Sequence, residues 1–200
     1  MNFSFTNVSI CQESKKEVKN FMSQVTKMKL ADALEQILQN TSISKVTVLD
    51  IVNISGVSRQ TFYNNFIDIY DLVYWTHMVR TKEAIDTFWE NEDFCQSFEM
   101  SIIIMREHKI FYQQIIRKEG VNSFQRLFAQ QNIELSKVRI KNVSDRKIDK
   151  KIEFLLELYW YGTAQMLVNW IENGMKEKPK ELAQLFYEGL PLSLRHYWSK

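Results

Sequence analysis

The sequence predicts an all-α fold. Chain breakers are scarce, because the 200 residues include only 5 glycines and 2 prolines, whereas sandwiches and barrels need turn residues at short intervals. Apolar residues also recur at helical spacing, most clearly over residues 152–170. Apolar side chains make up 45% of the chain, which is enough to fill a core at this length. We therefore expect a folded helical protein.

Composition and charge exclude several classes of protein. The net charge of +2 is too small to identify a nucleic-acid binder from electrostatics alone. Cys11 and Cys95 share no close spacing, so they indicate neither a disulfide framework nor a zinc site and suit free thiols in a reducing cytosol. The N-terminus lacks the pattern of a signal peptide, and polar residues interrupt the most apolar stretch, 154–171. We expect a cytoplasmic protein.

The first forty residues predict a loose arm followed by helix. Residues 1–13 show no helical periodicity, whereas 14–17 have the spacing of a capping box. Apolar residues then recur at helical intervals up to residue 40, and Thr26 is a candidate N-cap for a second helix within this stretch. The pattern leaves open whether residues 14–40 form one helix or two.

A short helix and a tight turn are predicted next. Residues 47–50, Thr-Val-Leu-Asp, form another capping box and mark the start of the helix. Gly56 ends it, because glycine accepts the left-handed conformation that a tight turn needs. The buried side of this helix is assigned to Ile51, Val52 and Ile54.

A second short helix follows the turn, and Ser58 can cap it. Phe62 and Phe66 are four residues apart and face inward. The polar side chains left on the outer face are Arg59, Gln60, Thr61, Tyr63 and Asn64.

The middle of the chain predicts further helices. Asp68 can cap a long helix that extends towards Trp89, and residues 93–141 indicate two or three more helices with a break at Gly120. Residues 137–151 contain seven basic and two acidic residues, which we interpret as a solvated connection.

The C-terminal part predicts two long helices. Residues 152–171 are apolar on two sides, so we expect this helix to be buried on two sides. Residues 173–174, Asn-Gly, end it, and Pro179 suits the first turn of a last helix. That last helix is expected to carry Leu182, Leu185, Phe186, Gly189 and Leu194.

Two braced short helices with a glycine-bearing turn have the layout of a helix-turn-helix. Packing against the first helix holds the second one rigidly, so that its exposed polar side chains can enter a major groove. Arginine can form a bidentate pair of hydrogen bonds with guanine, and glutamine can do so with adenine. Hydroxyl groups suit phosphate oxygens, which set the register without reading the sequence.

Residues 47–72, TVLDIVNISGVSRQTFYNNFIDIYDL, closely resemble the DNA-binding domain of TetR-family transcriptional regulators. The resemblance rests on the Thr-capped first helix, Gly56-Val57-Ser58 in the turn, Thr61-Phe62-Tyr63 in the recognition helix and Phe66 after it. It extends back to residue 26. The Arg-Gln-Thr-Phe-Tyr string and residues 170–175 also resemble, loosely, a subset of the family that includes dihydroxyacetone kinase regulators.

The resemblance implies three regions: an arm or extra helix over 1–22, a helix-turn-helix domain over 23–68, and an effector-binding and dimerisation domain over 69–200. It implies that the chain acts as a homodimer on a near-palindromic operator in double-stranded DNA. The DNA-binding candidates are Thr47, Ser58, Arg59, Gln60, Thr61, Tyr63, Asn64 and Asn65.

One position departs from the family pattern. Members often carry a lysine at the start of the fourth helix that contacts a phosphate, and this chain has Ile69 there. Asn64 or the N-terminal lysines are candidates to replace that contact. Lys15, Lys16 and Lys19 could form an arm in the minor groove, although a solvated helix face explains them equally well.

The family resemblance also implies an effector pocket and a dimer interface in the C-terminal part. Gly162 interrupts a strong helix, which suggests a close approach of backbones there. For the pocket the candidates are Trp75, Phe111, Tyr112, Trp160 and Met166, and the alternative that they only fill the core stays open. For the interface they are Leu156, Tyr159, Gly162, Thr163, Met166, Trp170, Leu185 and Gly189.

The sequence indicates no catalytic residues, no metal site and no cofactor. His77, His108 and His196 are scattered, and neither a Gly-rich phosphate loop nor a nucleophile elbow occurs. Two other classes stay open, a protein-binding coregulator that keeps the helix-turn-helix as a scaffold and a helical-bundle enzyme. A small molecule or a protein coregulator could control the regulator. A repressor is the expected type, although the residues themselves do not decide between repression and activation.

Overall fold

The structure is a computed structural model that describes residues 23–91, 93–116, 123–144 and 147–198. The chain divides into two compact units, an N-terminal unit that ends at Thr76 and a C-terminal unit that begins at His77. The boundary falls inside a long helix, α4 (Ile69–Asn91), so this helix contributes residues to both units.

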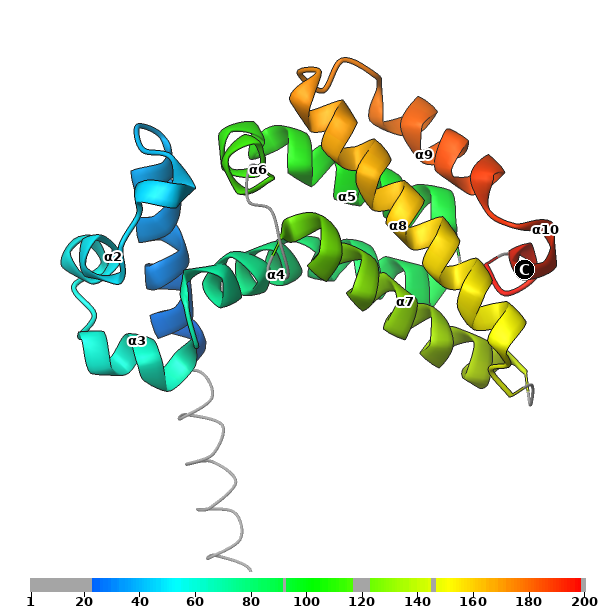
Figure 1. Cartoon of the computed structure of the whole chain (residues 1–200), viewed down its shortest axis with the longest axis horizontal. Coiled ribbons are helices and arrows are strands. Elements are labelled where there is room, and N and C mark those ends of the chain that lie inside the picture. Colours follow the sequence, from blue (N-terminus) through cyan, green and yellow to red (C-terminus); the bar gives the residue numbers. More distant parts are fainter. Residues whose placement is uncertain (1–22, 92, 117–122, 145–146, 199–200) are drawn as a thin grey trace, which may run out of the picture. The chain divides into compact units, whose positions relative to one another are not determined.

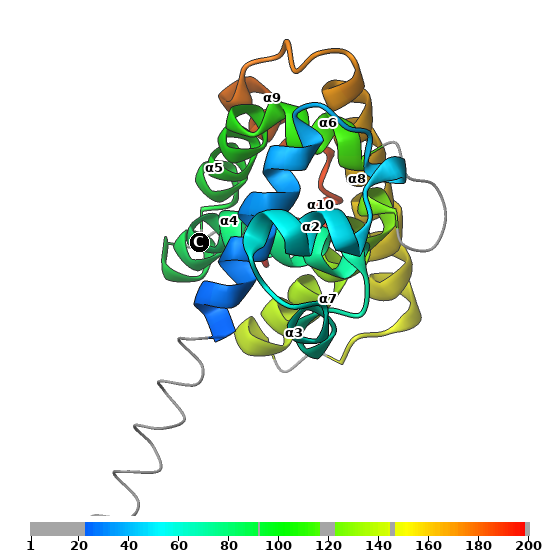
Figure 2. The same cartoon turned by 90° about the vertical axis from the view of Figure 1, so that its left-hand side faces the viewer.

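The N-terminal unit is a small bundle of short helices (Figures 1 and 2). Residues 23–38 form one helix, and the 3₁₀ turn η1 (Ile43–Lys45) leads to α2 (Val48–Ser55) and α3 (Arg59–Asn65). The core of the unit consists of side chains that exclude solvent entirely, namely Leu30, Leu34, Leu38, Ile51, Phe62 and Leu72.

Local side-chain signals set the ends of these short helices. The hydroxyl of Thr47 accepts from the Asp50 backbone N–H at 3.2 Å, and the Asp50 carboxylate accepts from the Thr47 N–H at 2.9 Å. Gly56 follows α2 with φ of 67°, and Ser58 accepts from the Thr61 N–H at 3.1 Å to begin α3. Asp68 accepts from the Asp71 N–H at 2.8 Å and begins α4. These four predicted boundaries are confirmed.

The C-terminal unit is a larger helical bundle. It contains α5 (Phe94–Glu107), α6 (Lys109–Ile115), α7 (Phe124–Val143), α8 (Lys150–Glu172), α9 (Pro179–Gly189) and α10 (Leu192–Arg195). Helix α7 packs along α8, and α5 packs along α9 (Figure 1). Asn173 and Gly174, the latter with φ of 90°, end α8, and Pro179 occupies the first turn of α9, as predicted.

Aromatic rings fill the space between these helices. Phe94 and Phe98 of α5 stack with their centroids 5.1 Å apart, and Phe98 meets Phe186 of α9 edge to face at 5.1 Å. Phe128 of α7 contacts Trp160 of α8 at 6.3 Å. Such offset and edge-to-face pairs add to the stability that burial provides. The described residues include no β-strand, which confirms the all-α prediction.

Several detailed predictions are wrong. Thr26 does not begin a helix, because it lies inside the continuous helix over 23–38. Ile54 is 48% exposed, since α2 turns only Ile51 and Val52 towards the core. Leu194 belongs to a separate helix, α10, because Pro191 follows the end of α9 and cannot continue it.

The basic run is not a loop throughout. The first part of the run, up to Val143, continues α7. Arg139 within this part is buried, and its guanidinium Nε donates to the backbone carbonyl of Tyr197 at 2.9 Å. The interpretation as a solvated connection is therefore wrong for this part. The predicted arm, the capping box at 14–17, the three N-terminal lysines and Gly120 lie outside the described residues.

Among the described residues, no helix combines the length and the apolarity that crossing a lipid bilayer requires.

Candidate functional site

Helix α3 is held against α2 by its apolar side. Phe62 is fully buried, and Phe66, which follows the helix, is 3% exposed. The two rings lie 5.9 Å apart, and Phe66 also meets Trp75 of α4 edge to face at 5.8 Å. Because bulky rings anchor one side of so short a helix, the rotation of α3 about its axis is fixed, and its other side faces solvent.

The outer side of α3 is polar. Arg59, Gln60, Tyr63 and Asn64 are exposed. The guanidinium of Arg59 lies 5.8 Å from the centre of the Tyr63 ring, which aligns a cation and a phenol along the same edge of the helix. These four side chains can therefore meet a ligand from solvent.

The other four DNA-binding candidates have structural contacts. Thr47 caps α2, and Ser58 shares a 2.8 Å hydrogen bond with the Thr61 hydroxyl at the start of α3. The Asn65 side chain donates to the Thr61 carbonyl at 2.8 Å and accepts from Ser23 at 3.1 Å. These side chains stabilise the helix-turn-helix and tie α3 to the helix over 23–38.

A partly enclosed cavity of about 80 Å³ lies within the C-terminal unit. Helices α4, α5, α7 and α8 line it, together with Trp198 near the C-terminus. Aromatic rings form most of its wall, namely Phe88, Trp89, Phe94, Phe98, Phe128, Trp160 and Trp198. A cavity of this kind can bind a small ligand.

Two polar side chains of the cavity have unusual surroundings. Arg139 lies with its guanidinium 5.4 Å from the centre of the Phe88 ring. Burial, and secondly the charge of Arg80, lowers the pKa of His77 to about 3, so its imidazole is neutral at pH 7. His77 Nδ1 and the Tyr112 hydroxyl lie 2.9 Å apart and share a hydrogen bond.

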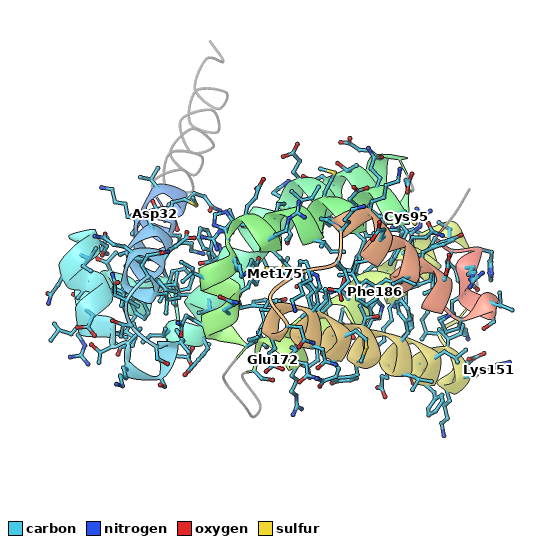
Figure 3. The ribbon with its side chains drawn as sticks, turned by 90° about the horizontal axis from the view of Figure 1, so that it is seen from above. Asp32, Cys95, Lys151, Glu172, Met175 and Phe186 are labelled. Atoms are coloured by element: carbon cyan, nitrogen blue, oxygen red, sulfur yellow. The ribbon has the colours of Figure 1, made fainter. Side chains whose placement is uncertain are left out.

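An apolar groove runs between α8 and α9. Its volume is about 550 Å³. The Tyr159 hydroxyl ties the two helices together by donating to the carbonyl of Phe186 at 2.8 Å. Figure 3 marks the position of Phe186 on α9. A Cβ atom placed on Gly162 or Gly189, which both line the groove, would meet no atom within 4 Å other than those of the adjacent residues and of the helix backbone that carries it. Large exposed apolar side chains lie on these two helices, namely Phe154, Leu158, Met166 and Leu185.

Comparison with known proteins decides the family. Residues 92–190 match the TetR_C_8 family model, described as a transcriptional regulator C-terminal region. The chain belongs to the TetR family of transcriptional regulators. This assignment places it among regulators and not among enzymes.

The chain is also similar to two proteins named DhaS. One is the HTH-type dhaKLM operon transcriptional activator DhaS of Lactococcus lactis subsp. lactis (strain IL1403), which is 29% identical over 94 residues. That match spans 46% of this chain and 49% of the relative, about half the length of each. The other is a solved structure of the dihydroxyacetone kinase operon activator DhaS, with a TM-score of 0.60. It is 20% identical and covers 88% of this chain and 99% of its own, and at this identity it supports the fold alone.

The cavity differs from the effector pocket that the TetR resemblance implied. Of the five candidates, Trp160 lines it. Phe111 and Tyr112 are buried in the core beside it, Met166 is 51% exposed on α8, and Trp75 belongs to the N-terminal unit. Sequence reasoning missed Arg139 and Gln131, although the position of Arg139 between the apolar Val138 and Ile140 was an available signal.

The TetR-type interface candidates fall into two groups. Leu156, Tyr159, Thr163 and Trp170 are buried in the core of their own chain. Gly162, Met166, Leu185 and Gly189 are exposed at the groove. One apolar face of α8 is therefore buried within the chain, while the other faces solvent. Burial of the second face belongs to the dimer that the TetR resemblance implies and stays a prediction.

In the described ranges, no three His, Cys, Asp or Glu side chains gather where they could hold a metal ion. His77 lies in the core, while His196 is exposed on the surface.

Proposed function

We propose that this TetR-family chain is a sequence-specific DNA-binding regulator that places α3 in the major groove. The observation that carries this proposal is the exposed polar edge of a rigidly braced short helix, formed by Arg59, Gln60, Tyr63 and Asn64. Arg59 and Gln60 have the donors and acceptors that read guanine and adenine. Tyr63 offers a hydroxyl to a phosphate, which positions the helix.

The groove between α8 and α9 supports a homodimer. Its exposed apolar side chains, such as Leu158 at 62% and Leu185 at 60%, are costly to leave in water. Gly162 and Gly189 leave space there for another backbone to approach closely. Two copies joined through this groove would present two recognition helices to half-sites about 34–36 Å apart on a near-palindromic operator.

Control by an effector is the third part of the proposal. Helix α4 lines the cavity through Thr81 and Phe88, and its first turns carry Trp75 against Phe66 at the end of the recognition helix. A ligand that binds one state of α4 better than another shifts the population between those states. DNA affinity then changes by no more than the ligand's differential affinity.

One comparison also bears on whether the regulator activates or represses transcription. The relative with 29% identity is named an activator, which favours activation over the repression expected from the sequence. A reporter gene downstream of the selected operator tests this point, because expression that rises with the regulator indicates activation and expression that falls indicates repression.

A protein-binding coregulator is the second candidate function. The described part of the N-terminal unit contains four basic and five acidic residues. It therefore lacks the excess of positive charge that is usual in a DNA-binding domain. A regulator that only binds protein would show no salt-sensitive affinity for any duplex.

Selection of bound sequences from a random duplex pool, at physiological salt and with purified full-length protein, tests the main proposal. We expect a palindromic motif with half-sites one helical turn apart. Recovery of nothing above background, both with and without a cell extract as a source of coligands, contradicts DNA binding and favours the coregulator.

A further inference from the structure

We propose that the cavity of the C-terminal unit binds a small uncharged molecule that carries two or more hydroxyl groups. This inference rests on the effector control proposed above and specifies the ligand class. It follows from three properties of the cavity: its size, the use of its hydrogen-bond donors, and its charge.

The size of the cavity limits the ligand. A volume of about 80 Å³ is roughly half that of an engineered cavity known to hold one benzene molecule, about 150 Å³. The carbon skeleton of the ligand is therefore short, and the rings of Phe98, Phe128 and Trp160 provide apolar surface for its C–H groups. Larger drug-like molecules do not fit.

The hydroxyl groups that line the cavity already use their protons. Thr81 donates to the His77 carbonyl at 2.9 Å, Ser97 donates to the Ala84 carbonyl at 2.6 Å, and Ser136 donates to the Asn132 carbonyl at 2.6 Å. Each hydroxyl proton is thus directed at the helix backbone. What the Thr81 and Ser97 oxygens can still offer a ligand is lone pairs, so they act as acceptors. The Ser136 oxygen already accepts from the Trp160 indole N–H at 2.8 Å and has one lone pair left.

Gln131 adds a further acceptor. Its side-chain oxygen Oε1 is buried and has no hydrogen-bond partner among the described residues. A buried acceptor without a donor carries a desolvation penalty, so a molecule from outside the chain that donates a hydrogen bond is favoured there. The lining therefore selects a ligand with several O–H or N–H donors.

The charge of the lining selects among such donors. Of the described residues that line the cavity, Arg139 is the one with a formal charge, since His77 is neutral and none is Asp or Glu. A cationic amine would be repelled by Arg139. A carboxylate could pair with Arg139, but it has only acceptors and would leave the buried Gln131 oxygen without a donor. An uncharged polyol donates to these acceptors, and its own oxygens can accept from the guanidinium.

Protein-observed NMR titration with four three-carbon probes tests the proposal: glycerol, 1-propanol, propionate and propylammonium. We expect glycerol to give saturable shifts of resonances from the cavity, with an affinity at least about tenfold higher than that of each other probe, or about 1.4 kcal/mol. Propionate or propylammonium as the tightest ligand, equal binding of glycerol and 1-propanol, or no saturable binding of glycerol overturns it.

Gln131→Met and the neighbouring Gln130→Met form a matched pair of variants, since Gln130 is exposed and does not line the cavity. Gln131→Met should weaken glycerol binding at least about tenfold, while Gln130→Met should leave it unchanged. Equal effects of the two substitutions overturn the role of Gln131. NMR detects ligand binding directly, so a failure of DNA binding is recorded separately from a failure of this inference.

A second inference comes from an independent contact in the N-terminal unit and rests on the proposed DNA binding. The Lys27 ammonium lies 5.4 Å from the centre of the Phe66 ring and 5.7 Å from that of Trp75. One turn earlier, Ser23 donates to Asn65 of α3 at 3.1 Å. A cation is thus held at the end of the recognition helix, next to Ile67, which is 84% exposed.

We infer that Lys27 binds a backbone phosphate beside the groove that α3 enters. The positive charge of Lys27 is important for phosphate binding because the described part of this unit has only four basic residues. Ile69, at the start of α4, provides no positive charge there. A phosphate contact carries no sequence information, so its loss weakens binding to every sequence alike.

Lys27→Gln and Lys29→Gln form the matched pair for this test, and Lys27→Arg is the rescue variant. We expect Lys27→Gln to weaken binding to operator and to random DNA by the same factor and to reduce the salt slope by about 1. Lys29→Gln and Lys27→Arg should keep the wild-type slope. An unchanged slope in Lys27→Gln overturns this inference alone, whereas wild-type protein without salt-dependent binding overturns the proposed function as well.

Discussion

The imidazole of His77 and the hydroxyl of Tyr112 share a buried hydrogen bond of 2.9 Å between α4 and α6. The rings of Phe124 and Phe128 pack against the same imidazole, with centroids at 5.0 Å and 5.9 Å. This apolar surrounding keeps the imidazole neutral, because burial lowers the pKa of His77 to about 3. The stability of the C-terminal unit therefore depends on pH.

Protonation of His77 should destabilise the folded chain below neutral pH. The folded pKa of about 3 lies below the unfolded value of 6.5, so between these values the unfolded state binds more protons. The free energy of unfolding should fall as pH drops from 6.5 towards 3, by about 1.4 kcal/mol per pH unit from this group. Urea unfolding of wild type and His77→Gln over that range measures the difference in slope.

His196→Gln is the control, because His196 is exposed. It should keep the wild-type slope, whereas His77→Gln should flatten the slope whatever the stability of that variant at pH 7. Parallel curves for wild type and His77→Gln would show that His77 is not the titrating group.

Arg59 and Tyr63 should affect DNA binding differently. Arg59→Ala should cost about 1–3 kcal/mol on the operator and relax the base preference at one position. Tyr63→Ala should weaken binding to operator and random DNA by similar factors, since a phosphate contact is independent of sequence. Fluorescence anisotropy with both duplexes at two salt concentrations measures this. Equal losses on both duplexes for both variants would refute the division of roles.

Substitution in the groove between α8 and α9 should break the homodimer. Leu185→Glu places a carboxylate on a 60% exposed apolar position that lines the groove. Burying that charge in an interface is costly, so we expect dimerisation to weaken by about 1.4 kcal/mol or more, at least tenfold. Sedimentation velocity at micromolar concentration reports the shift. Val138→Glu on α7, 49% exposed, should leave the association unchanged.

Arg139 should stabilise the C-terminal end of the chain. Arg139→Met removes the donor that satisfies the buried Tyr197 carbonyl, so we expect a loss of about 1–3 kcal/mol in the free energy of unfolding. Lys141→Met, on an exposed part of the same helix, should cost much less. Thermal unfolding of the two variants compares them, and equal losses would contradict a specific role for the Arg139 contact.

The sequence by itself determined several helix boundaries and the candidate recognition helix. Thr47, Gly56, Ser58 and Pro179 act on groups within about four residues, so their effects can be predicted without knowing what lies across the core. The polar edge of α3 follows in the same way, because Phe62 and Phe66 orient so short a helix by their spacing alone.

Only the tertiary structure decided which apolar face of α8 the chain buries and which residues surround the cavity. Leu156 and Leu158 look alike in the sequence, yet the first is fully buried and the second is 62% exposed. The rotation of a helix with two apolar sides depends on its neighbours, here α7 and α9. The cavity joins Thr81 of α4 to Gln131 and Arg139 of α7, and no local pattern brings residues so distant in the sequence together.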